Sequence, residues 1–187
     1  MLLWIILAIV AVALLYAVVV FNNLVRTRQM ANEAWSGIDV QLKRRHDLVP
    51  NLVDAVKGYA GHERSVLEQV TQLRSAARAL PQGDVAARAQ AEGALSAALG
   101  KLFALAENYP DLKASNNFLE LQKQLSDLEN ELQMARRYYN GTVRNLNVLV
   151  QSFPSNLIAG LFGFGPREFF ELAEGEGAVP QVNLAPR

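Results

Sequence analysis

The chain has 187 residues, with 18 Lys and Arg balanced by 18 Asp and Glu, so its formal net charge is zero. This balance excludes the basic excess with which nucleic-acid-binding domains neutralise phosphates, and we expect no nucleic-acid partner. The absence of cysteine excludes disulfides, thiolate catalysis and cysteine-ligated zinc, and it fits a reducing cytoplasm.

The first predicted element is an uncharged apolar helix at residues 2–21. At about 1.5 Å per residue such a helix matches a bilayer core of roughly 30 Å. A cleaved signal peptide is the alternative, but no Lys or Arg precedes the segment, and apolar residues continue beyond the small triplet Ala11–Ala13. We therefore interpret residues 1–22 as a retained anchor of a single-pass cell-membrane protein.

Basic residues follow the anchor and none precedes it. Arg26 and Arg28 lie just after the span, close enough to contact lipid head groups. The positive-inside rule then predicts that the N-terminus is outside and that the remaining chain is cytoplasmic.

Between residues 24 and 153 the apolar residues recur with helical periodicity. The longest run is a seam from Phe118 to Phe153, typical of a coiled coil or a bundle helix. Breaks are expected at residues 58–61, 81–84 and 108–111. Asp84 is expected to cap the third helix, and Asn117 with Glu120 has the spacing of a capping box. These features predict an all-α fold: an N-terminal transmembrane helix followed by a long antiparallel up-and-down four-helix bundle over residues 23–155.

Two features stand out within the first bundle helix. Pro50 removes a backbone hydrogen bond while the apolar periodicity continues past it, which predicts a kinked helix. The kink either bends the helix around the bundle or opens a binding pocket. The basic run Lys43, Arg44 and Arg45 is expected to form a solvated face with one residue extending from the seam, or to contact anionic lipid or an acidic partner.

Residues 156–187 differ in character, being rich in Gly and Phe up to residue 170 and then punctuated by Gly and Pro. The apolar part is too short to span a membrane. It is expected to pack on the bundle, lie at the membrane interface or bind another copy of the chain. The residues from Ala173 to Arg187 are expected to be disordered. The candidate contact residues here are Leu157, Phe162, Phe164, Phe169 and Phe170.

Two dense blocks of sequence resemble the LemA family of bacterial membrane proteins. The first block comprises residues 34–53, 56–59 and 62–63; the second comprises residues 107–113, 118–122, 135–140 and 153–156. The resemblance also includes the N-terminal anchor. It implies a short exposed N-terminus, one span and a bundle of long helices, and it implies no enzymatic activity. Relatives in magnetosome-forming bacteria are linked to building an internal membrane, which favours a membrane-organising role.

The search for catalytic chemistry gives no candidate residues. The pairs His46–Asp47 and His62–Glu63 are adjacent, whereas metal ligands on a helix need a spacing of three or four residues. No serine lies in a nucleophile elbow, and no cofactor is expected.

The sequence therefore predicts a non-enzymatic, membrane-anchored scaffold that organises proteins or membrane, as a homo-oligomer. The alternatives are a sensor or adaptor that captures an unidentified protein partner through the C-terminal segment, and a membrane-bound enzyme with a site at the Pro50 kink.

Overall fold

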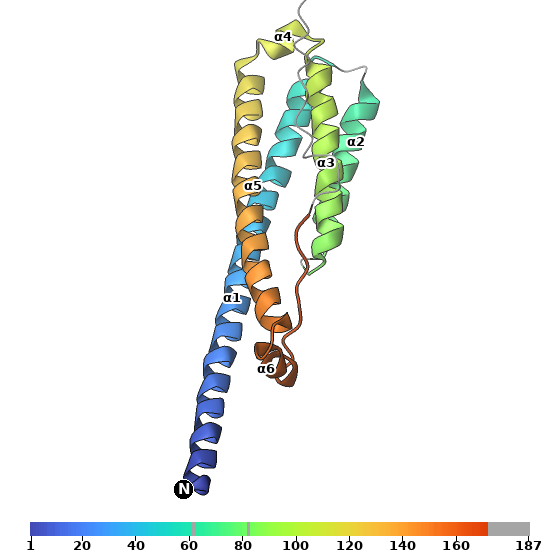
Figure 1. Ribbon diagram of the computed structural model, residues 1–187. Helices are drawn as coiled ribbons and strands as arrows, with labels where there is room; N and C mark the ends of the chain where they lie inside the picture. The colour runs from blue at the N-terminus through green and yellow to red at the C-terminus, as the bar shows by residue number, and fades with distance from the viewer. Residues whose placement is uncertain (61–62, 82, 172–187) are drawn as a thin grey trace, which may run out of the picture.

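The computed structural model describes residues 1–60, 63–81 and 83–171, and every regular element in these ranges is a helix (Figure 1). His62 and the tail from Ala173 to Arg187 lie outside the described residues. The helices are α1 (Leu2–Lys57), α2 (Arg64–Ala79), α3 (Val85–Ala106), α4 (Pro110–Lys113), α5 (Asn116–Gln151) and α6 (Ser155–Leu161).

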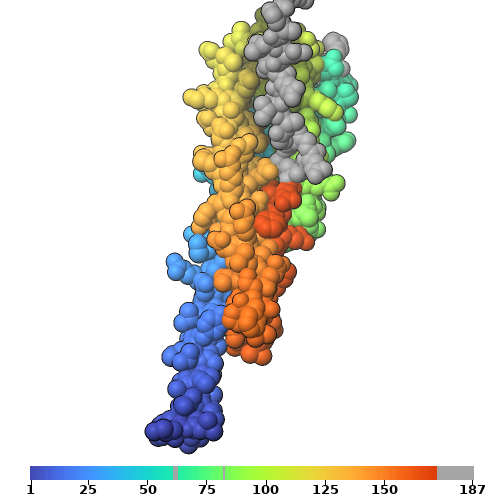
Figure 2. All heavy atoms as spheres, viewed as in Figure 1, coloured from blue at the N-terminus to red at the C-terminus, as the bar shows by residue number. Residues whose placement is uncertain are grey.

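Helix α1 is continuous from the apolar segment into the packed helices. Its 56 residues include Pro50 and show no break at the boundary expected after residue 22. Its first residues are all exposed, and Val20 is the first buried side chain. Among the described residues, one helix, α1, is thus long and apolar enough to be a candidate membrane span. Figure 2 shows its N-terminal part, in dark blue, projecting alone from the rest of the molecule.

Helices α1 and α5 lie side by side in opposite directions (Figure 1). Small residues of α1, Ala31 and Ala34, allow close approach, and Ile38 and Leu42 continue the buried face towards Tyr139 of α5. The spacing of three to four residues keeps these side chains on one helix face.

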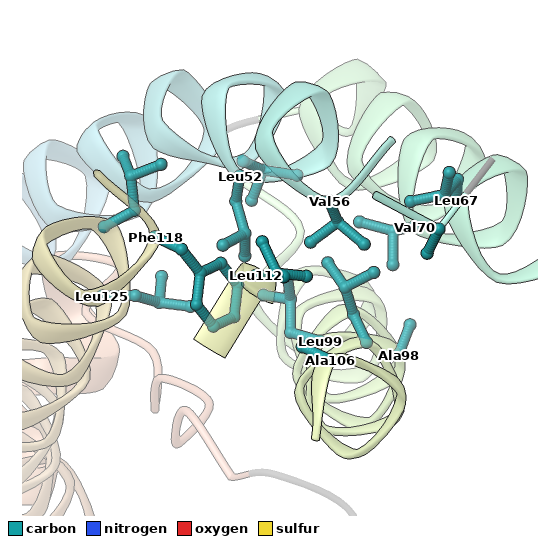
Figure 3. Close-up of a cluster of buried hydrophobic side chains, with 14 of the residues drawn as sticks. Leu52, Val56, Leu67, Val70, Ala98, Leu99, Ala106, Leu112, Phe118 and Leu125 are labelled. Atoms are coloured by element: carbon teal, nitrogen blue, oxygen red, sulfur yellow. The ribbon is translucent and has the colours of Figure 1, made fainter. Parts of the chain in front are cut away.

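Helices α2 and α3 form a second pair beside the C-terminal half of α1. All the long helices and α4 contribute to one aliphatic cluster, in which Val56, Val70, Leu99 and Phe118 meet from four different helices (Figure 3). Each fully buried Leu or Phe of this kind contributes about 1.5–3 kcal/mol through the hydrophobic effect.

The expected helix boundaries are mostly confirmed. The Asp84 side chain caps α3 by accepting a hydrogen bond of 2.9 Å from the amide of Ala87. The predicted cap at Asn117 is wrong, because α5 begins one residue before it and Ser115 is the N-cap residue. The seam also ends earlier than predicted, since α5 stops at Gln151 and leaves Phe153 80% exposed.

After α5 the chain reverses direction. Residues 153–162, which we call the foot, contain α6 and lie at the end of α5 nearest the apolar segment (Figure 1). Residues 163–171, which we call the strap, are non-helical and run back along the molecule.

Candidate functional site

A buried ionic cluster joins three helices at the middle of the molecule. Arg45 of α1 and Glu92 of α3 are each only 2% exposed, and Arg45 Nη1 lies 3.5 Å from Glu92 Oε2. Arg45 Nε lies 3.1 Å from Glu129 Oε1 of α5. Arg45 Nη2 donates a hydrogen bond of 2.5 Å to Ser96 Oγ. One guanidinium therefore binds α3 and α5 at once, which suits its rigid planar fork.

His46 extends this cluster from the next position on α1. Its Nε2 lies 2.8 Å from Glu92 Oε1, and Arg74 of α2 donates a hydrogen bond of 2.6 Å to the His46 carbonyl oxygen. A histidine beside a carboxylate has the geometry of a base and its orienting partner. Here Glu92 also binds Arg45, so the contacts seen are those of a cluster that fixes four helices in one register.

The basic run of α1 is thus divided between two environments. Lys43 and Arg44 are exposed, and Arg44 Nη1 lies 3.5 Å from Glu131 Oε2 in a surface ion pair. Such exposed pairs contribute about 0–1 kcal/mol. Arg45 differs from the expected solvated side chain because it occupies the polar gap in the α1 seam, where Glu92 and Glu129 reach it. It has no surface left to offer lipid or an acidic partner.

Two asparagines on α5 hold the strap by its backbone. Asn147 Oδ1 accepts 2.8 Å from the Arg167 amide while its Nδ2 donates 2.9 Å to the Arg167 carbonyl. Asn140 makes the same pair of bonds with Phe170, at 2.9 and 3.2 Å. Seven helical residues rise about 10.5 Å and three extended residues about 10 Å. The distance between the two asparagines along α5 therefore matches the distance between Arg167 and Phe170 along the strap. Each asparagine side chain bonds the strap as a peptide group of a neighbouring β-strand would.

Aromatic packing closes the strap onto the helices. Phe170 is 1% exposed and its ring lies 5.7 Å from Trp35, which in turn lies 5.3 Å from Tyr139. Tyr139 donates a hydrogen bond of 3.0 Å to the Glu168 carbonyl. Burial raises the pKa of the Tyr139 phenol above its usual 10.0; the charge of Arg167 opposes this shift and that of Glu168 adds to it.

The foot and the first residues of the strap lie against the end of the apolar segment. The Phe21 ring lies 4.7 Å from Phe162 and 5.9 Å from Phe164, and the Arg28 guanidinium lies 4.7 Å above the Phe164 ring. Phe164 is buried with Val20.

The candidate contact residues of the C-terminal segment thus divide into two groups. Phe164 and Phe170 pack within the chain, and Leu157, Phe162 and Phe169 are exposed. Of the two arginines expected at head groups, Arg26 is exposed and Arg28 is half-buried under the strap.

A cavity of about 260 Å³ opens beside the strap, and its lining includes Asn32, Tyr139 and Arg167. The lining residues do not include His46 or Glu92. Within residues 1–60, 63–81 and 83–171, no three His, Asp or Glu side chains gather closely enough to hold a metal ion.

Sequence reasoning missed Glu92, Glu129 and the strap contacts. A signal for Glu92 exists: it lies three residues before Leu95, in register with the apolar face of its helix, and it matches the polar gap at Arg45. No comparable signal marks the strap, because its partners Asn140 and Asn147 lie about twenty to thirty residues away in sequence.

The sequence is similar to known bacterial proteins over most of its length. The sequence model of the LemA family matches residues 34–184. Protein LemA of Metamycoplasma hominis is 29% identical over 138 residues, which cover 74% of this chain and 63% of that relative.

Magnetosome proteins of the MamQ type are also similar. Magnetosome protein MamQ of Magnetospirillum gryphiswaldense is 24% identical, with 87% of this chain and 70% of the relative covered. Magnetosome protein MamQ 2 of Paramagnetospirillum magneticum is 25% identical, with coverages of 81% and 64%. The chain thus spans between about three fifths and seven tenths of the length of these relatives.

Proposed function

The chain belongs to the LemA family, and from that premise we propose that it is a non-enzymatic, membrane-anchored helical scaffold that organises proteins or membrane by self-assembly. The observation that carries the proposal is the continuity of α1. The same helix supplies the exposed apolar segment and the buried face of the packed helices, so whatever the packed helices bind is held rigidly at the bilayer.

In this proposal the long helices act together as one antiparallel four-helix bundle, and its core and ionic cluster keep it rigid. Support comes from the aliphatic cluster that α1, α2, α3 and α5 share and from Arg45, which binds α3 and α5 together. A rigid body of this kind suits a spacer or scaffold, because its binding surfaces stay at fixed heights above the membrane.

Self-assembly is supported by exposed apolar side chains on α5. Met134 is 61% and Tyr138 52% exposed, and they lie one turn apart on the same face. Unpartnered apolar side chains on a surface helix are typical of interaction sites. We propose that this face contacts a second copy in the plane of the membrane.

The mass of the detergent-solubilised protein, measured by light scattering, tests the assembly. We expect an oligomer that dissociates when Met134→Glu and Tyr138→Glu are combined, because carboxylates would be placed on both sides of the contact. The matched control is Gln133→Glu, which adds a charge at an exposed position next to Met134. A monomeric wild-type protein, or an oligomer unaffected by the double substitution, contradicts self-assembly.

The proposed topology places the N-terminus outside the cell and the helical domain in the cytoplasm, since Arg26 and Arg28 follow the apolar segment. Single cysteines after Met1 and at Ser115 are introduced into this cysteine-free chain, and intact cells are treated with an impermeant maleimide. We expect labelling only near Met1. Labelling only at position 115 would reverse the topology and move the function to the envelope side.

The enzyme alternative is tested by a metal screen and a broad hydrolase assay on the solubilised protein. We expect no turnover. Reproducible turnover that disappears in His46→Ala would contradict the non-enzymatic proposal, because His46 and its carboxylate partner are the residues best placed for proton transfer.

A further inference from the structure

The foot covers the last turn of the apolar segment. Every side chain from Leu2 to Tyr16 is exposed, Ala17 is half-buried, and Val20 is buried with Ala159 of α6. The residues below the foot would form a helix of about 22 Å, which is too short for a bilayer core of roughly 30 Å. The segment reaches that length only if residues up to Phe21, and the foot beside them, lie at the depth of the membrane boundary.

The surface of the foot has the chemistry that this depth requires. Apart from Asn156, its exposed side chains are apolar, and no charged residue occurs from Asn145 to Pro166. The exposed apolar residues are Phe153, Leu157, Leu161 and Phe162, with Val148 in the adjoining turn of α5. Leu157 and Leu161 lie one turn apart on α6, and the Phe162 ring packs at a tilt against Phe21 at the end of the span.

Three chain segments change from uncharged to cationic within about two helical turns of one another. The first charge after the span is Arg26, the last charge before the foot is Arg144 on α5, and the first charge after it is Arg167 on the strap. Leu146 packs with Leu24, which sets Arg144 near the level of Arg26. Arg167 hydrogen-bonds Asn32 two turns above Leu24. Cationic side chains just outside an apolar band are favourable near lipid phosphates.

We infer that the foot docks into the head-group and upper acyl layer of the same bilayer that holds α1, with Arg26, Arg144 and Arg167 facing the phosphates. This inference rests on the proposed membrane anchoring. The protein then has two membrane contacts, one that spans the bilayer and one that enters a single leaflet to a depth of about 5–10 Å. The foot continues the surface of the span at Phe21 and Phe162, so the bilayer that covers one reaches the other.

Depth-dependent fluorescence quenching tests the inference on the full chain. Single cysteines at Leu7, Leu161 and Gln122 are labelled with the environment-sensitive dye NBD, and each variant is reconstituted into phosphatidylcholine vesicles. The vesicles contain phosphatidylcholine with a nitroxide near the head group or deep in the acyl chain. Circular dichroism checks that each labelled variant retains its helices, and Gln122 is the exposed control at the far end of α5.

The expected result is strong quenching at Leu161 by the shallow nitroxide, quenching at Leu7 by the deep nitroxide, and none at Gln122. Quenching at Leu7 without any at Leu161 overturns the foot inference and leaves the anchor intact. A blue-shifted but unquenched Leu161 label also overturns it, because protein would then cover the foot. An unquenched Leu7 label overturns the proposed anchoring itself.

Discussion

The two ends of the helical domain are stabilised in different ways. At the end far from the apolar segment, Leu, Val and Ala side chains from α1, α2, α3 and α5 fill the core by helical periodicity alone. At the near end α1 and α5 continue with only the short helix α6 beside them, and the remaining space is filled by Phe164, Phe170 and asparagine bonds to a non-helical strap. Apolar residues at helical periodicity are sufficient where several helices surround a core. Where too few helices are present to enclose a core, specific contacts between residues far apart in sequence are needed.

The largest effect is expected at the ionic cluster, which separates the two ends. Glu92→Gln removes the carboxylate that faces Arg45 and His46 while keeping its size, and loss of one partner of a buried pair costs about 3–5 kcal/mol. We expect a large drop in the melting temperature of the detergent-solubilised full chain, measured by far-UV circular dichroism.

The matched control is Glu131→Gln, which removes a carboxylate from an exposed pair with Arg44 and should cost about 0–1 kcal/mol. Equal melting temperatures for the two variants would show that burial of Glu92 adds no stability over an exposed ion pair. The ionic cluster would then not separate two differently stabilised ends.

A smaller and local effect is expected at the strap. Asn140→Ala combined with Asn147→Ala leaves the amide and carbonyl groups of Arg167 and Phe170 without these partners. Each buried group left unsatisfied costs about 1–3 kcal/mol of stability. The strap should detach while the helices stay folded, so trypsin should cut after Arg167 much faster.

Asn145→Ala changes an exposed asparagine on the same helix and should leave the cleavage rate unchanged. The contrary outcome is a double variant that lowers the melting temperature of the helices as much as Glu92→Gln does. In that case the strap does not detach separately, and the near end unfolds together with the helices.

The smallest effect is expected at Tyr139. Tyr139→Phe removes the hydrogen bond from the Tyr139 hydroxyl to the Glu168 carbonyl, which should lower the free energy of unfolding by about 1 kcal/mol. Because the pKa of Tyr139 is raised in the folded protein, the folded state holds the phenolic proton more tightly, and this stability is lost as the pH rises above 10.0.

Urea denaturation between pH 8 and 11 should therefore show the difference between wild type and Tyr139→Phe narrowing above pH 10. A difference that stays constant across this range would mean that the phenol ionises as readily in the folded as in the unfolded chain.

The same division explains what the sequence could predict. The helix breaks and the Asp84 cap follow from local signals, and the far core follows from periodicity, although Leu128 in the predicted seam is only half-buried. Asn117 was misplaced as a cap because the local motif does not register α4 (Pro110–Lys113). Only Ala114 and Ser115 separate α4 from α5, so α5 already begins at Asn116.

The ionic cluster was half predictable. Arg45 stands out as a polar residue in an apolar seam, but its partner Glu92 is a residue type that is normally exposed, and only the packing of α3 against α1 brings the two together. The contacts of Phe170 with Trp35 and Tyr139 depend on a chain reversal that has no periodic signature.

In the proposed membrane anchoring, helix α1 also acts as a rigid arm. From Phe21 to Lys57 it extends about 54 Å beyond the apolar segment without a break. Transmembrane helices tilt by about 0–40°, and a change of about 10° at the membrane would move the far end sideways by about 9 Å. Bilayer thickness would then set the position of the far core, and a foot docked in the head-group and upper acyl layer would limit this sideways movement.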